Sequence, residues 1–140
     1  MNPEPHRSMQ TTISISLGSA LDMAEIPSRS VDLIVTSPPY PMIGMWDEVF
    51  AGQDQRIREH LDLKRGREAF ALMHRLLDRA WGECDRVLRP GGIVCINIGD
   101  ATRTIDKDFQ LYSNHSRILQ FFLDQGYAAL PDILWRKQTN

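Results

Sequence analysis

Two consecutive prolines, Pro38 and Pro39, stand directly after an apolar run of the sequence. A proline has no backbone N–H to donate to a neighbouring strand, so a hydrogen-bonded ladder cannot continue through the pair. The run before them, Val-Asp-Leu-Ile-Val, has the length and composition of a buried strand. The sequence therefore predicts a strand over residues 31–36 that ends abruptly between Ser37 and Tyr40.

Strand-like and helix-like segments alternate along the rest of the chain. Apolar residues spaced i, i+3, i+4 predict amphipathic helices, and short apolar or alternating runs predict strands. Such an alternation is typical of an α/β fold with a mostly parallel sheet and flanking helices. The predicted strands are residues 13–17, 31–36, 93–98 and 127–135, and the predicted helices are residues 20–26, 67–88 and 113–125, with a helical turn within 53–62.

The length of 140 residues suits one domain, with residues 1–10 as a flexible tail and residues 11–140 as the folded part. The net charge of -2 gives no overall basic signal for nucleic acid, although a local basic patch does not show in a total. Cys84 and Cys95 form neither a disulfide framework nor a zinc motif, so no metal is expected. The sequence has no secretory signal and no long apolar run, which predicts a cytoplasmic location and no membrane contact.

The strand end from Ser37 to Tyr40 carries the first functional hypothesis. In open parallel sheets, ligands bind beyond the carboxyl ends of the strands. There the Pro38 carbonyl and the Ser37 hydroxyl can each accept one N–H of a single amino group, and Tyr40 can stack on the flat ring that bears it. Two such acceptors suit the exocyclic amino group of a nucleobase, because they leave the nitrogen lone pair free to attack a methyl donor. A structural turn that ends the strand is the simpler alternative.

The stretch VDLIVTSPPY resembles motif IV of the amino-methylating DNA methyltransferases, in which a hydrophobic strand precedes Asp/Asn/Ser-Pro-Pro-Tyr/Phe. Other segments resemble the family in the same order. Residues 17–21 are similar to a Gly-Asp-x-Leu segment before motif IV, RVLRPGGIVCINIGD is similar to the helix end and strand after it, and ILWRKQTN is similar to a later Trp-x-Lys-Pro-Asn segment. The resemblance covers most of residues 13–140.

The resemblance implies a Rossmann-like methyltransferase fold, S-adenosyl-L-methionine as the cofactor, and double-stranded DNA with a flipped base as the substrate. It assigns the catalytic positions to Ser37, Pro38, Pro39 and Tyr40, and it links the chain to DNA methylation in restriction-modification systems. Serine before the proline pair favours the N4 amino group of cytosine, with the N6 amino group of adenine as the alternative. Attack by an amino nitrogen needs no cysteine nucleophile.

The chain also departs from the family pattern. The Phe-x-Gly-x-Gly loop, which holds the methionine part of the cofactor in this family, does not occur in the 140 residues. Motif IV near the start fits the permuted, β-type order, in which the glycine loop comes later. Ser19 and the pair Gln138-Thr139 also replace the usual Asp and Pro. We therefore expect a partial Rossmann-like fold whose cofactor-loop half is absent, and a C-terminal half or second subunit as a partner. A truncated, non-catalytic half is the alternative to an active enzyme.

Two polar residues near the end of a predicted strand, Asn97 and Asp100, are candidates for supporting Ser37, since polar groups in a buried run need partners. A local turn cap is an equal alternative for them. A small basic group can contact DNA phosphates or form a solvated face. The members of this basic group are Lys64, Arg65 and Arg67.

Overall fold

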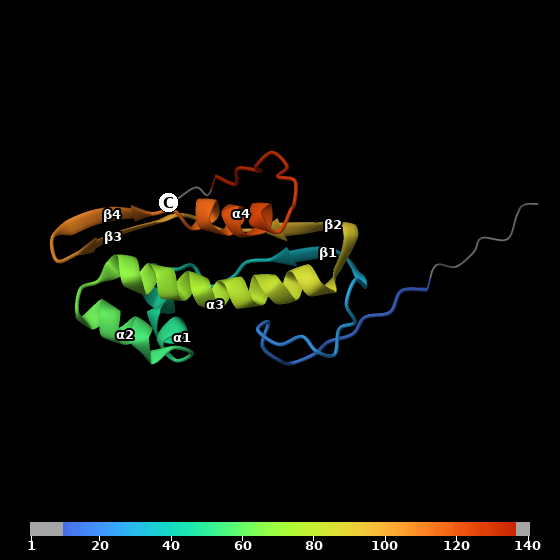
Figure 1. Ribbon diagram of the computed structural model, residues 1–140, viewed down its shortest axis with the longest axis horizontal. Coiled ribbons are helices and arrows are strands. Elements are labelled where there is room, and N and C mark those ends of the chain that lie inside the picture. Colours follow the sequence, from blue (N-terminus) through green and yellow to red (C-terminus); the bar gives the residue numbers. More distant parts are fainter. Residues whose placement is uncertain (1–9, 137–140) are drawn as a thin grey trace, which may run out of the picture.

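The computed structural model describes residues 10–136, so residues 1–9 of the predicted tail and residues 137–140 lie outside the described part. Figure 1 shows how its helices and strands are arranged. In chain order they are β1 (Val31–Thr36), the 3-10 helix η1 (Gly44–Trp46), α1 (Asp47–Ala51), α2 (Gln55–Asp62), α3 (Gly66–Val87), β2 (Leu88–Ile96), β3 (Ala101–Ile105), β4 (Asp108–Tyr112) and α4 (Asn114–Asp124).

β1 and β2 form a parallel pair, and the segment from η1 to α3 is the crossover between them. The strand predicted over 31–36 is confirmed. The register places Thr36 opposite Ile96, so the carboxyl ends of the two strands lie side by side. The strand predicted over 93–98 is confirmed in part, because it already begins at Leu88 and ends at Ile96.

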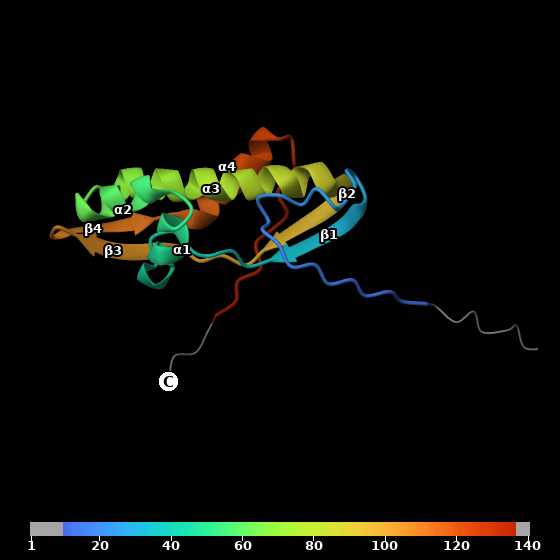
Figure 2. The same cartoon turned by 90° about the horizontal axis from the view of Figure 1, so that it is seen from below.

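α3 covers one side of this pair, and α4 packs against α3. α3 confirms the helix predicted over 67–88, and Figure 2 shows it running along one side of β1 and β2. α4 confirms the helix predicted over 113–125 and packs against α3, with the ring centroids of Phe122 and Trp81 5.9 Å apart. The buried core of the described residues also draws on α1, α2 and the segment after β2, and it consists of Met42, Phe50, Ile57, Ala69, Leu72, Met73, Leu76, Leu77, Trp81, Cys84, Ala101, Tyr112, Ile118 and Phe122.

The antiparallel hairpin of β3 and β4 has no counterpart among the predicted elements. Its two turn residues, Asp106 and Lys107, have φ angles of 51° and 67°, as a type I′ turn requires. The usual sequence signal for such a turn is Asn-Gly or Asp-Gly, and Asp-Lys lacks it. The Arg103 guanidinium donates to both carboxylate oxygens of Asp47 at 2.9 and 2.8 Å, which ties the hairpin to α1.

The strands predicted over 13–17 and 127–135 are wrong for the described structure, in which both segments are irregular. Ile13, Ile15 and Leu17 are 83%, 94% and 106% exposed. A strand needs a neighbour for its backbone groups, and no strand in the described part pairs with either segment. An alternation of apolar and polar residues predicts which face a strand would bury, but it carries no information about the partner.

The helix predicted over 20–26 is also wrong, because this segment forms turns. Leu21 N–H donates to Ser19 Oγ at 3.2 Å, and local bonds of this kind compete with a helix for the backbone. The helical turn predicted within 53–62 is confirmed as α2. Asp54 caps α2 by accepting a backbone N–H of its first turn at 3.1 Å.

Candidate active site

The parallel ladder stops one residue beyond the two strands. Asn97 N–H donates to Thr36 O at 2.9 Å, and the two prolines after Ser37 have no N–H with which to continue. Ser37 is exposed and Tyr40 is partly buried. The hydrogen bonds formed among the described residues engage neither Ser37 Oγ nor the Pro38 carbonyl. Both predicted acceptors are therefore free at the carboxyl end of β1.

The chain turns sharply directly after Tyr40. Ile43 N–H donates to Tyr40 O at 3.2 Å, with Pro41 second in the turn and Met42 third at a φ of 66°. This is the arrangement of a type II turn, in which proline suits the second position and glycine or asparagine the third. A methionine in the left-handed region is strained, and the Met42 side chain, only 1% exposed, is held there by the core. Core packing therefore fixes the backbone next to the candidate site.

Asn114, the first residue of α4, joins the loops that follow β1 and β2. Its Nδ2 donates to Pro41 O at 3.1 Å and to Gly99 O at 3.0 Å. Its Oδ1 accepts from His74 Nε2 at 3.0 Å. Because both Nδ2 hydrogens go to carbonyl groups, Oδ1 has to be the acceptor, which assigns the imidazole proton to Nε2. Asn114 and His74 are both 0% exposed, so they form a buried clamp between the helices and the two strand ends.

His74, in α3, keeps this clamp in one protonation state. Burial lowers the pKa of His74 from 6.5 to about 4; the hydrogen bond to Asn114 opposes the lowering, and the positive charge of Arg117 adds to it. The imidazole Nδ1 is buried without a hydrogen-bond partner in the described part of the chain. The imidazole is therefore neutral at pH 7, and its single N–H holds the Asn114 amide in one orientation.

Neither Asn114 nor His74 stands out in the sequence. An asparagine at the start of a helix predicts a cap at most. The Asn114 side chain instead reaches Pro41, 73 positions earlier, and His74, 40 positions earlier. No spacing rule for a single helix or strand connects positions so far apart.

The Tyr40 ring lies against the backbone of the loop after β2. A β carbon built on Gly99 would be 3.4 Å from Tyr40 Cε2 and 3.8 Å from Cδ2. The clamp residue Asn114 binds the carbonyl of Gly99 and the carbonyl of Pro41, which follows Tyr40. An aromatic ring fixed beside two free acceptors can stack on a flat group whose amino hydrogens those acceptors bind.

Asn97 and Asp100 occupy different environments. Asn97 is exposed, and its backbone continues the ladder at the strand end beside Ser37. The Asp100 carboxylate accepts from Ser113 Oγ at 3.2 Å and from His115 N–H at 3.0 Å, so it caps the first turn of α4. These contacts join the loop after β2 to α4, and a supporting role for Asn97 or Asp100 stays a prediction.

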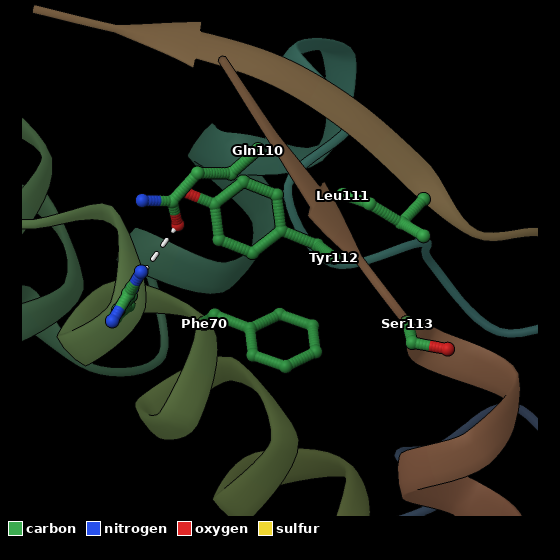
Figure 3. A pocket seen from close by; sticks show the side chains of 6 residues that line it. Phe70, Gln110, Leu111, Tyr112 and Ser113 are labelled. Atoms are coloured by element: carbon green, nitrogen blue, oxygen red, sulfur yellow. Dashed lines mark hydrogen bonds between the residues drawn. The ribbon is translucent and has the colours of Figure 1, made fainter. Parts of the chain in front are cut away.

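A surface cavity of about 460 Å³ lies between the start of α3 and β4 (Figure 3). Arg67 Nε donates to Gln110 Oε1 there at 3.3 Å. Lys64 Nζ forms an ion pair with Asp106 Oδ1 at 3.0 Å. Two members of the basic group therefore contact the hairpin, and their contact with DNA phosphates stays a prediction.

The model of the N6/N4 methyltransferase family, described as DNA methylase, matches residues 31–140. This match begins at β1 and includes the whole stretch from Ser37 to Tyr40. The chain belongs to the N6/N4 DNA methylase family. The resemblance found in the sequence is confirmed at this level.

Two curated relatives agree with this membership. The chain is 51% identical over 133 residues to the Type II methyltransferase M.MthZI of Methanothermobacter thermautotrophicus. It is 45% identical over 145 residues to the Type II methyltransferase M.MjaI of Methanocaldococcus jannaschii. The matches cover 94% and 93% of this chain but 38% and 46% of the relatives. The chain therefore spans less than half the length of these curated relatives.

Solved structures of a candidate DNA methylase have a fold similar to that of this chain. Two crystal structures of TTHA0409 from Thermus thermophilus, a candidate DNA modification methylase, superpose with TM-scores of 0.57 and 0.59 at 27% and 28% identity. They match 81% and 82% of this chain and 40% and 41% of the TTHA0409 chain. The predicted α/β class is confirmed, and the described elements form part of a methyltransferase fold.

The glycine pair in the described part of the chain, Gly91 and Gly92, does not form a cofactor loop. A glycine-rich loop that follows a strand and opens a helix is the usual cradle for such a ligand. Gly91 and Gly92 instead lie within β2, directly after α3. Among residues 10–136, no three His, Cys, Asp or Glu side chains are placed to hold a metal ion. No helix in that range is long and apolar enough to cross a membrane.

Proposed function

We propose that this family member is the acceptor-binding part of a DNA methyltransferase that acts on the exocyclic N4 amino group of cytosine. The observation that carries the proposal is the pair of free acceptors, Ser37 Oγ and the Pro38 carbonyl, at the carboxyl end of β1 beside a fixed tyrosine. The substrate would be double-stranded DNA with the target base flipped out of the helix. A cytoplasmic location stays a prediction.

The residues of the strand end have separate tasks in this proposal. Ser37 Oγ and the Pro38 carbonyl each accept one N–H of the target amino group, which turns the nitrogen lone pair away from these two acceptors. The ring of Pro39 limits the backbone freedom of that carbonyl. Tyr40 stacks on the flipped base and holds its plane. Positive charge that develops on the nitrogen is stabilised by the fixed carbonyl dipole.

The cofactor of the proposed reaction is S-adenosyl-L-methionine, which supplies a methyl group on an electron-poor sulfonium. Because the Phe-x-Gly-x-Gly loop does not occur in the 140 residues, we propose that another polypeptide, as a C-terminal half or a second subunit, binds it. The isolated 140-residue chain would then be inactive. This incomplete half is the second candidate function, and it is supported by the missing glycine loop. Adenine N6 is the alternative acceptor, since the same two oxygens fit its amino group.

The test supplies the missing part in trans. The complementing polypeptide is the part of the M.MthZI relative that lies outside the segment matched by this chain. The chain, the complementing polypeptide and unmethylated DNA are incubated with labelled S-adenosylmethionine, and the DNA nucleosides are separated. We expect N4-methylcytosine with both polypeptides and none with either alone. N6-methyladenine would assign the alternative acceptor. Calorimetric binding of S-adenosylmethionine by the chain alone would contradict the incomplete-half candidate.

A substitution separates positioning of the amino group from DNA binding. Pro38→Ala frees the backbone that carries the acceptor carbonyl, so we expect kcat to fall at least about tenfold while Kd for DNA changes less than about twofold. Pro90→Ala is the matched control, because Pro90 is exposed and lies at the opposite end of β2. Equal losses of kcat and of DNA affinity in Pro38→Ala would refute the positioning role.

A further inference from the structure

One face of the β1–β2 pair is apolar and open. In the parallel register Leu33 is opposite Ile93 and Val35 is opposite Cys95, so these four side chains share one face. Leu33, Val35 and Ile93 are 53%, 73% and 47% exposed, and Cys95 is exposed as well. We call this set the open face. Figure 2 shows α3 on the other side of the two strands and no described helix on this side.

An open apolar face is unusual for parallel strands. Parallel sheets have both faces covered, since the crossovers between their strands place helices on them. The opposite face of the same strands follows this rule, because Ile34, Val94 and Ile96 pack against the buried core. The sheet is also narrow: within the described residues β1 pairs with β2 alone, so one edge of β1 has unpaired backbone groups.

Apolar segments that precede and follow the two strands in the sequence are exposed too. Residues 13–17 present three apolar side chains that are each more than 80% exposed, and Ile133, Leu134 and Trp135 are 95%, 92% and 75% exposed. The chain therefore exposes large apolar side chains besides those of the open face, and large exposed apolar patches mark interaction sites in proteins. The open face lies between these segments in the order of the chain.

We propose that the open face is the docking surface for the polypeptide that supplies the rest of the methyltransferase fold. This polypeptide packs an apolar helix on Leu33, Val35 and Ile93, and it pairs a strand with the free edge of β1. This inference rests on the proposed function, because it names the surface on which the complementing polypeptide of that proposal binds. The size of the relatives supports this occupant: 94% of this chain matches only 38% of M.MthZI, so the remainder of that protein is large enough to cover the sheet. A second copy of this chain would not supply a glycine loop, because both copies lack it.

Cys95 reports on the open face without any mutation. Its thiol is exposed, whereas Cys84 is buried and burial raises the pKa of the Cys84 thiol. In the free chain we therefore expect one thiol to react rapidly with a disulfide reagent and the other slowly. Addition of the complementing polypeptide should slow the rapid reaction at least about tenfold. An unchanged rate at a concentration where the two polypeptides associate would overturn the proposal. So would protection that grows with the concentration of this chain alone, since it would identify a second copy as the occupant.

Two matched substitutions test the surface itself. Val35→Asp places a charge on the open face, and Leu111→Asp places one on the outer side of the hairpin, where Leu111 is 64% exposed. We expect Val35→Asp to weaken association with the complementing polypeptide about 100-fold and Leu111→Asp to change it less than about threefold. Equal effects would overturn the assignment. Circular dichroism verifies that each variant is folded, and Cys95 protection in the unmutated chain decides the question if Val35→Asp unfolds.

The two proposals fail in distinguishable ways. Protection of Cys95 without methyl transfer would leave the docking surface in place and refute the acceptor chemistry. Methyl transfer by the mixture without protection of Cys95 would support the chemistry and refute the docking surface.

Discussion

Acid should destabilise the fold through His74. The unfolded imidazole takes up a proton as the pH falls through 6.5, whereas the folded one does so only near pH 4 because burial disfavours its charged form. Between these values the unfolded state binds more protons, so acidification favours unfolding. The contribution of His74 to stability is fully present above pH 6.5 and is lost as the pH falls to about 4.

The size of the effect follows from the same two values. Each pH unit within the window contributes up to about 1.4 kcal/mol, so the whole window is worth about 3 kcal/mol. Screening by solvent does not reduce this figure much, because His74 is 0% exposed. Such a loss is a large part of the roughly 5–15 kcal/mol by which folded proteins are typically stable.

The assay is denaturation by urea at pH 7, 6, 5 and 4.5 for the unmutated chain and for His74→Gln. Glutamine keeps an N–H that can donate to Asn114 but has no proton to gain in this range. Glu83, whose pKa is lowered to about 2 by its hydrogen bonds to Arg86 and the Met23 N–H, is present in both proteins, so its contribution cancels in the difference. We expect the unmutated chain to lose about 1 kcal/mol more per pH unit than the variant below pH 6.5.

Two results would decide against this reasoning. Parallel stability curves for the unmutated chain and His74→Gln would mean that the folded imidazole titrates at its ordinary pH. An NMR titration in which the His74 ring gains its proton near pH 6.5 would lead to the same conclusion. His115→Gln, at an exposed position, is the control for exchanging an imidazole for an amide, and its free energy of unfolding at pH 7 should remain nearly that of the unmutated chain.

Three further experiments test the clamp and the ring beside it. Asn114→Leu removes two buried hydrogen bonds and one that is partly buried, and it should cost about 2–4 kcal/mol in urea denaturation. Asn97→Leu, at an exposed position, should cost less than about 1 kcal/mol. Gly99→Ala should be tolerated, because its methyl group would meet the Tyr40 ring at 3.4 Å, but Gly99→Val should displace the ring and change the near-ultraviolet circular dichroism. Tyr40→Ala should weaken capture of a flipped 2-aminopurine by the complemented protein, and undiminished methylation by this variant would refute the stacking role.

Local sequence patterns were enough to predict the elements whose stability depends mainly on one amphipathic face. α3 and α4 follow from helical spacing, and β1 follows from an apolar run that two prolines stop. The residues 13–17 carry an equally clear alternating pattern and still form no strand in the described structure. The difference is physical, since a helix satisfies its backbone internally and a strand depends on a neighbour.

The candidate site also has a part that the sequence predicts and a part that it does not predict. The free acceptors at Ser37 and Pro38 follow from the chemistry of proline and from the place of the motif at a strand end. The clamp of His74 and Asn114 does not, because it brings together residues from two helices and two loops. Its members are ordinary polar residues in the sequence, and only their burial gives them a role.

The acceptors and the open face depend on different contacts within this chain. The backbone beside Tyr40 is held by the Asn114 clamp and by the burial of Met42, all on the side of the helices. Val35 and Cys95 contribute nothing to those contacts, since they lie on the opposite face of the same strands. Docking of a partner on the open face should therefore leave the arrangement of Tyr40 unchanged while it protects Cys95. Near-ultraviolet circular dichroism of Tyr40 in the chain, taken as the difference from Tyr40→Phe, should be the same before and after the complementing polypeptide binds. A large change would mean that the acceptor site is completed by docking and is not preformed by the residues of this chain.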